Sequence, residues 1–165
     1  MAAEASELNY KAIGEYAEFV GRHYGIHSND GPADIEALVR DLGGRIEYAE
    51  SNESMHVRSK GDFTIYLSEY TSRRRDRFTI AHELGHYYLH YVHPEKTTED
   101  GFGRGERNLV ETQANVFAAS LLMPADLFKA AHRELGGESW SLAERFGVSP
   151  SAAGVRCQVL GLAVR

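Results

Sequence analysis

Two histidines and a glutamate stand close together in the run His82-Glu83-Leu84-Gly85-His86. Positions four residues apart lie on the same face of an α-helix, so His82 and His86 can present two imidazoles to one metal ion. Glu83 lies about 100° further round the helix, where its carboxylate can act on a water molecule at the metal without being a ligand. This spacing predicts the site of a zinc hydrolase.

The residues around this run indicate that it lies on a helix. From about Ser72 to Tyr91 the apolar side chains follow the spacing of a buried helical stripe, with Ser72 or Thr71 as the N-cap. The alternative is a core helix whose histidines hydrogen-bond to neighbouring groups. Burying two histidines and a glutamate without a metal carries a desolvation cost, so a metal site is the favoured interpretation.

A third protein ligand is required, because a hydrolytic zinc site has three and leaves one position open. The extended motif with a third histidine is not met, since Leu89 and Val92 stand at its glycine and histidine positions. Glu111 is the predicted third ligand, on a second predicted helix that ends at Pro124. Asn115 follows one turn later and can hold the outer N–H of a ligand histidine. Taken alone, Glu111 would be interpreted as a first-turn glutamate that interacts with the helix dipole.

Two longer motifs contain these residues: R-F-T-I-A-H-E-L-G-H at residues 77–86 and E-x-x-A-N-x-F-A-A-x-L-L-M-P at residues 111–124. Together with Ala33-Asp34-Ile35-Glu36-Ala37-Leu38 and Leu42-Gly43, they resemble the ImmA/IrrE family of bacterial and phage metallopeptidases over roughly residues 33–124. The resemblance implies a zincin-like fold with gluzincin-type ligation. It also implies that the substrate is a helix-turn-helix transcriptional repressor, whose cleavage relieves repression in a mobile element or a stress regulon.

The resemblance assigns metal binding to His82, His86 and Glu111, and catalysis to Glu83 as the base that takes a proton from water and returns it to the leaving amine. Zn²⁺ is the expected cofactor, although imidazole and carboxylate ligands also admit Mn²⁺ or Fe²⁺. The group that stabilises the oxyanion is left open among four residues: His90, Tyr70, Tyr88 and His93.

The order of the predicted elements is that of an α+β fold. Patterning predicts helices at Leu8–Tyr24 and Asp34–Leu42, then strands at Arg45–Tyr48, Met55–Arg58 and Phe63–Leu67, ahead of the two motif helices. The strands are expected to form a small antiparallel sheet packed on helices. One of the last two is expected to be an edge strand that pairs with an extended substrate.

Two further segments complete the predicted layout. His93–Asn108 is rich in charge and glycine and is expected to be a mobile loop that borders the substrate, or a disordered one with no role. Ser141–Leu162 resembles a helical, helix-turn-helix-like hairpin, with Ser149 as an N-cap. Its second helix offers only Arg156 and Gln158 for contact with DNA, so a structural hairpin is favoured over a DNA reader.

Length and composition place the chain among small intracellular domains. Its 165 residues predict one metallopeptidase domain, divided into an N-terminal helix and loop (1–32), a zincin-like core (33–128) and a C-terminal helical appendage (129–165). The net charge of −6 argues against direct nucleic-acid binding. A single cysteine, no secretory signal and no long apolar stretch predict a cytoplasmic protein without membrane contact.

The alternative function is a non-catalytic regulatory protein, either a DNA-binding protein or a toxin–antitoxin component, in which the metal has only a structural role. A coordination position open to water distinguishes the enzyme from such a protein.

Overall fold

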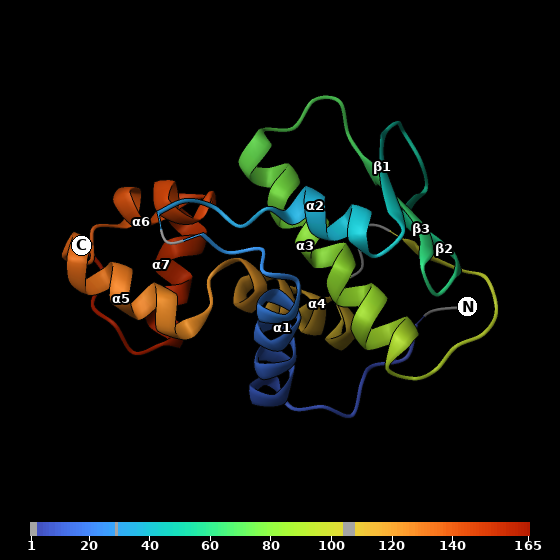
Figure 1. The fold of residues 1–165 in the computed structure, drawn as a ribbon, viewed down its shortest axis with the longest axis horizontal. Helices are drawn as coiled ribbons and strands as arrows, with labels where there is room; N and C mark the ends of the chain where they lie inside the picture. Colours follow the sequence, from blue (N-terminus) through green and yellow to red (C-terminus); the bar gives the residue numbers. More distant parts are fainter. Residues whose placement is uncertain (1–2, 29, 104–107) are drawn as a thin grey trace.

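The computed structural model describes residues 3–28, 30–103 and 108–165. Helices pack against one small sheet (Figure 1), which confirms the predicted α+β class. The strands are β1 (Gly44–Tyr48), β2 (Glu53–Ser59), β3 (Asp62–Leu67) and β4 (Asp100–Gly103). The helices are α1 (Tyr10–Tyr24), α2 (Ile35–Asp41), α3 (Arg73–Tyr87), the π-helical η1 (Tyr88–Val92), α4 (Leu109–Leu122), α5 (Ala125–Leu135), α6 (Ser139–Phe146) and α7 (Pro150–Val159).

The sheet has the strand order β1-β3-β2-β4 and is mixed rather than antiparallel. β2 and β3 form an antiparallel hairpin, and β1 adds to β3 in parallel, with Ile46 opposite Ile65. Gly43 has a φ of 87°, and a side chain there would collide with Gly61 O, so a glycine is needed where the chain enters β1 beside the hairpin turn. The prediction that β2 or β3 forms an edge is wrong, because each lies between two other strands.

A fourth strand lies within the segment that the sequence analysis predicts as a loop, His93–Asn108. β4 pairs antiparallel with β2, with Phe102 opposite Met55. Glycine has a low strand propensity, so pairing with β2 overrides the local preference of this segment. Residues 104–107 of the predicted loop lie outside the described residues.

α3 contacts β2 and β3 and packs along α4, which in turn packs against α1 (Figure 1). Ser72 caps α3 by accepting a hydrogen bond from the Arg75 N–H, as the sequence predicts. The core between these elements contains fully buried side chains from the sheet, α3 and α4, among them Ile65, Leu84 and Phe117. Across the described ranges, no helix has the length and apolar character needed to span a membrane.

The last three helices, α5, α6 and α7, gather at the opposite end of the molecule from the sheet (Figure 1). α6 ends at Gly147, whose φ is 66°, and Ser149 caps α7, as predicted for a helical hairpin. Arg156 is buried and donates a hydrogen bond from Nε to Met123 O. The predicted division between residues 128 and 129 falls within α5 and stays a prediction.

Candidate metal centre

The predicted ligands lie where α3 and α4 run side by side. His82 and His86 stand one turn apart on α3, and Glu111 lies in the first turn of α4. Asn108 caps α4 by accepting a hydrogen bond of 3.1 Å from the Glu111 N–H. The packing of the two helices thus brings a carboxylate at the start of α4 against two imidazoles in the second half of α3.

One carboxylate faces both imidazoles. Glu111 Oε2 lies 2.7 Å from His82 Nε2, and Glu111 Oε1 lies 3.0 Å from His86 Nε2. Ligand atoms of these three side chains lie within 4.8 Å of one another, and they form the one such group of His, Cys, Asp and Glu among the residues that the structure describes. The structure therefore brings the three predicted ligands together.

The hydrogen bonds of the His82 and His86 rings indicate which of their nitrogens are available to bind a cation. His82 Nδ1 lies 2.7 Å from Asn115 Oδ1 and donates its proton there, so the lone pair of Nε2 in the neutral ring faces the carboxylate of Glu111. His86 Nε2 is buried and, within the described part of the chain, has no hydrogen-bond partner despite the nearby carboxylate. Nitrogen and oxygen lone pairs that face one another in this way fit a divalent cation.

The charges of the centre depend strongly on one another. Burial alone would raise the pKa of Glu111, but the close contacts with His82 and His86 outweigh burial and lower this pKa to about 2. Burial alone would lower the pKa of His82, but Glu111 and Glu83 outweigh burial and raise it. The raised pKa means that, without a cation, His82 Nε2 gains a proton more readily than a free imidazole does, and a divalent cation can take the place of that proton.

Glu83 is buried beside the two histidines predicted to be ligands, with 3% of its surface exposed. Burial raises the pKa of its carboxyl group, and the charges of His86 and His82 partly oppose this shift. Ser54, on β2, places its Oγ 3.0 Å from Glu83 Oε1. A buried carboxylate with a raised pKa is suited to accepting a proton and giving it back.

β4 lies against one side of the centre. The ring of Phe102 stacks on His86, with ring centroids 5.2 Å apart and an interplanar angle of 22°. Ser54 Oγ also lies 3.1 Å from Phe102 O and 3.3 Å from Gly103 O. The edge strand of the sheet is therefore next to a predicted ligand and to the predicted base.

The four residues left open for the oxyanion lie in different surroundings. His90 contacts the Nδ1 side of His86, away from the carboxylate, and Tyr88 packs on the ring of Phe117. Both are therefore set back from the side that Glu111 faces. Tyr70, which is exposed, and His93 stay predictions for this role.

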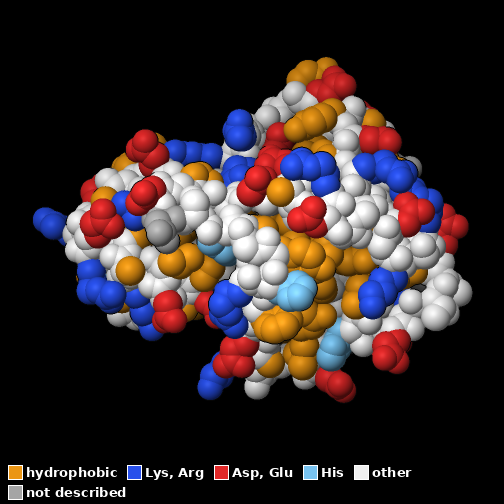
Figure 2. All heavy atoms as spheres, in the orientation of Figure 1, with side chains coloured by type: hydrophobic (Ala, Val, Ile, Leu, Met, Phe, Trp, Pro, Cys, Tyr) orange, Lys and Arg blue, Asp and Glu red, His pale blue; other side chains and the backbone are white. Residues whose placement is uncertain are grey.

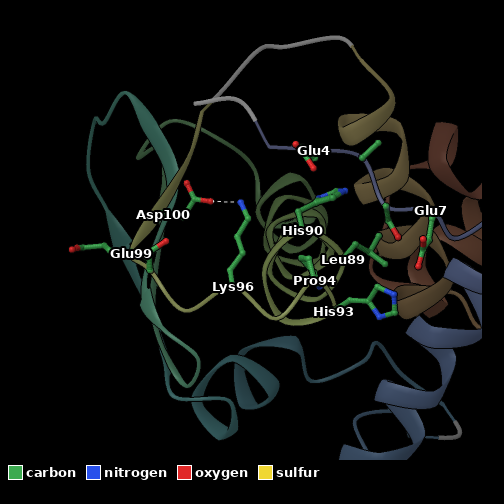
Figure 3. Close-up of a pocket in the computed structure, with 12 residues that line it drawn as sticks. Glu4, Glu7, Leu89, His90, His93, Pro94, Lys96, Glu99 and Asp100 are labelled. Atoms are coloured by element: carbon green, nitrogen blue, oxygen red, sulfur yellow. Dashed lines mark hydrogen bonds and ion pairs between the residues drawn. The ribbon is translucent and has the colours of Figure 1, made fainter.

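Three buried polar residues near the centre have partners that the sequence analysis did not predict: Ser54, His90 and Gln113. Their only signal in the sequence is a polar side chain at a position that the apolar pattern buries. A cavity of about 720 Å³ opens behind His90, between the segment that carries Glu4 and Glu7 and the segment that carries Lys96 and Asp100 (Figure 3).

A comparison with models of known protein families matches residues 40–158 to the family described as Peptidase_M78, IrrE N-terminal-like domain. No curated protein sequence matches the chain. The matched range covers well over half of the chain and contains both helices of the centre, α3 and α4. It excludes α1 and the segment before it.

Proposed function

This chain belongs to the Peptidase_M78 family of IrrE N-terminal-like domains, and we propose that it is a zinc-dependent endopeptidase that cleaves a helix-turn-helix transcriptional repressor. The observation that carries the proposal is the convergence of His82, His86 and Glu111 beside the buried carboxylate of Glu83. The ligand types also admit Mn²⁺ or Fe²⁺.

The residues of the centre would divide the work of hydrolysis. His82, His86 and Glu111 would hold the cation, and a bound divalent cation supplies Lewis acidity that polarises a peptide carbonyl and eases deprotonation of water. Glu83 accepts the proton of the attacking water and delivers it to the leaving amine. Ser54 donates a hydrogen bond to Glu83 Oε1, which holds the carboxylate in place for the proton transfer.

β4 supplies the surface that would orient an extended substrate. It is an edge strand, so one side of its backbone has no neighbouring strand among the described residues. A substrate segment that pairs with this side presents its peptide groups in a fixed register, beside the stacked rings of Phe102 and His86. We therefore propose that the strand that pairs with the substrate is β4, and not β2 or β3, which lie inside the sheet.

The choice of a repressor as the substrate is supported by the resemblance of the two helical motifs to the ImmA/IrrE family. Cleavage of a repressor would relieve repression in a mobile element or in a stress response. This role requires the cytoplasm, where transcriptional repressors act, and it requires no membrane contact.

The structure offers little support for the alternative of a DNA-binding protein. On α7, the second helix of the hairpin, the one basic side chain is Arg156, which is buried and bonded to Met123 O. On the molecular face shown in Figure 2, basic and acidic side chains are interspersed. Contact with phosphates instead needs several exposed lysines and arginines on one surface.

The experiment that tests the function is incubation of the zinc-loaded protein with a helix-turn-helix repressor encoded beside its gene, followed by mass spectrometry of the fragments. The matched control is Glu83→Gln, which keeps the shape of the side chain but accepts no proton. We expect it to bind zinc normally and to cleave about 10²- to 10⁴-fold more slowly. Equal cleavage by the two proteins would refute the role of Glu83, and no cleavage by the wild type would refute the proposed substrate.

A further inference from the structure

A chain of buried hydrogen bonds leads from the candidate metal centre to the segment before α1. His86 Nδ1 lies 2.9 Å from His90 Nδ1, and His90 Nε2 lies 2.9 Å from Gln113 Oε1. Gln113 also bonds to the backbone of Ser6, more than a hundred residues away in the sequence. Figure 3 shows the N-terminal segment passing beside His90. His86, His90 and Gln113 are each at most 2% exposed.

The backbone of Ser6 determines the orientation of the Gln113 amide. The Ser6 N–H donates to Gln113 Oε1 at 2.9 Å, and Gln113 Nε2 donates to Ser6 O at 2.8 Å. Only an oxygen can accept the first bond, and only an amide nitrogen can donate the second. The two ends of the amide are therefore assigned by chemistry, with the oxygen on the side of the His90 ring.

This orientation determines which nitrogen of His90 carries the proton. An amide oxygen only accepts hydrogen bonds, so His90 Nε2, 2.9 Å from Gln113 Oε1, must be the donor. The ring is buried, and its hydrogen bonds within the described part of the chain go to neutral groups, an amide and an imidazole, so a charge on it would be uncompensated. His90 is therefore a neutral ring with an unprotonated Nδ1.

The same reasoning extends to His86. Because His90 Nδ1 is an acceptor, His86 Nδ1 must donate the proton that lies between them. The remaining nitrogen, His86 Nε2, then offers its lone pair to the space in front of Glu111 Oε1, 3.0 Å away. This is the buried atom that has no hydrogen-bond partner in the described part of the chain.

We propose that the segment before α1 is a working part of the metal centre: through Gln113 and His90, the backbone of Ser6 holds His86 in the tautomer whose Nε2 binds the cation. Gln113 and His90 are positioning residues, and the inference rests on the proposed metal-dependent function. It extends the centre beyond the family match, because Ser6 lies outside residues 40–158.

The local helix geometry is an independent observation in favour of this role. α3 changes from α- to π-helical hydrogen bonding at Tyr88, and His90 lies within the π-helical turn, η1. Such turns are rare and occur frequently at functional sites. The wider turn carries His90, which bridges His86 on α3 and Gln113 on α4.

The protonation pattern can be observed directly. Long-range ¹H–¹⁵N spectra of histidine-labelled protein distinguish a ring protonated at Nε2 from one protonated at Nδ1. In the zinc-loaded protein we expect protonation at Nε2 for His90 and at Nδ1 for His86. In Gln113→Met, which lacks the amide, His90 should lose its fixed tautomer. A proton on Nδ1 of His90 in the wild type would overturn the inference.

Zinc affinity supplies the second readout. Gln113→Met should raise the zinc Kd about 10- to 100-fold, the range found when groups that support metal ligands are removed. Gln113→Glu keeps an oxygen acceptor for His90, so it should keep the His90 tautomer and bind zinc at least as tightly as Gln113→Met. The unrelated control is His27→Asn, which loses the bond from His27 Nε2 to Leu121 O further along α4 and should bind zinc normally.

The N-terminal segment is tested by a matched pair at Ser6. Ser6→Pro removes the N–H that donates to Gln113, whereas Ser6→Ala removes only the hydroxyl group, which accepts from the Leu8 N–H. Weaker zinc binding by Ser6→Pro alone supports the inference, and equal zinc affinity of Ser6→Pro, Gln113→Met and wild type overturns it. A wild type that binds no zinc would instead count against the proposed function itself.

Discussion

The hydroxyl group of Ser54 joins the predicted base to the edge strand. Its Oγ lies within 3.3 Å of three acceptors, namely Glu83 Oε1, Phe102 O and Gly103 O, but a hydroxyl group has a single proton to donate. Burial raises the pKa of Glu83, and the bond from Ser54 opposes that shift by favouring the ionised carboxylate. Ser54 is therefore well placed to keep Glu83 ready for proton transfer.

The residue-scale prediction concerns this hydroxyl group. Ser54→Ala should reduce the rate of peptide cleavage about tenfold, because a hydrogen bond to a charged group contributes about 1.5 kcal/mol and about 1.4 kcal/mol corresponds to a factor of ten in rate. Zinc affinity should be unchanged, since Ser54 contacts no predicted ligand. Ser54→Thr keeps the hydroxyl group and should retain most of the activity. An unchanged kcat in Ser54→Ala would show that Glu83 needs no such partner.

At the scale of the elements, the close approach of α3 and α4 depends on Gly85. A Cβ at this position would lie 3.0 Å from both Cα and O of Ala114 and 3.1 Å from Phe117 Cβ. Backbone atoms cannot move aside as a flexible side chain can. Glycine in a helix interior costs about 1 kcal/mol relative to alanine, so packing rather than helix propensity explains its presence here.

Gly85→Ala should therefore destabilise the protein by about 1–3 kcal/mol, the usual cost of overpacking, and should weaken zinc binding by separating Glu111 from the histidines. Urea unfolding and zinc titration measure the two effects. Gly154→Ala in α7 is the matched control, because a Cβ there meets nothing within 4 Å. It should stabilise the protein by up to about 1 kcal/mol. The opposite order of stabilities would contradict the packing argument.

The pairing of β2 with β4 carries a pH dependence. The hydrogen bond to Glu99 raises the pKa of His56, and the bond to Glu53 adds to this effect. Because the folded pKa exceeds the unfolded value of about 6.5, the stabilisation is fully present below that pH. It is lost as the pH rises through the folded pKa.

His56→Gln should consequently be less stable than wild type at pH 6, by less than about 1 kcal/mol because the group is partly exposed. The difference should shrink towards pH 9. Unfolding free energies of both proteins across this range measure it. A stability difference that grows with pH would mean that the neutral ring, rather than the charged one, supports β4.

At the scale of the whole molecule, the candidate ligands come from two different helices, α3 and α4. α3 and α4 are separated in the chain by η1 and β4, so a cation held by both helices would cross-link two segments that lie far apart in the sequence. A ligand that binds only the folded state stabilises it in proportion to its affinity and concentration.

Zinc at a free concentration of 100 times its Kd should stabilise the protein by about 2.7 kcal/mol, which raises the unfolding temperature by about 5–10 °C for a domain of this size. A chelator should reverse the shift. Glu83→Gln should show the full effect and Glu111→Ala little of it. An equal shift in both variants would place the zinc elsewhere.

The parts of the molecule that could be predicted from the sequence are those encoded within one or two helical turns. The spacing of His82 and His86, the caps at Ser72 and Ser149 and the order of α1, α2, β1, β2, β3, α3 and α4 all depend on neighbouring residues. Glu111 could be predicted as the third ligand because a catalytic zinc site needs three protein ligands. The structure brings these three side chains together.

The parts that could not be predicted depend on partners far away in the chain. β4 has a composition that disfavours strands and forms because β2 offers it a free edge. Gln113 gives no sign in the sequence that its partners are Ser6 and His90, because a buried amide becomes informative only when both of its ends are seen. The mixed sheet likewise follows from how β1 meets the hairpin, which short-range patterns do not specify.

The shortness of β4 limits which targets such a protease can process. An edge strand of four residues, Asp100–Gly103, can pair only with a short extended segment of a substrate. A helical segment cannot form these backbone hydrogen bonds with it. The proposed substrate, a helical repressor, would therefore have to unfold locally before cleavage, and the local stability of its helices would determine the cleavage site more than its residue sequence does.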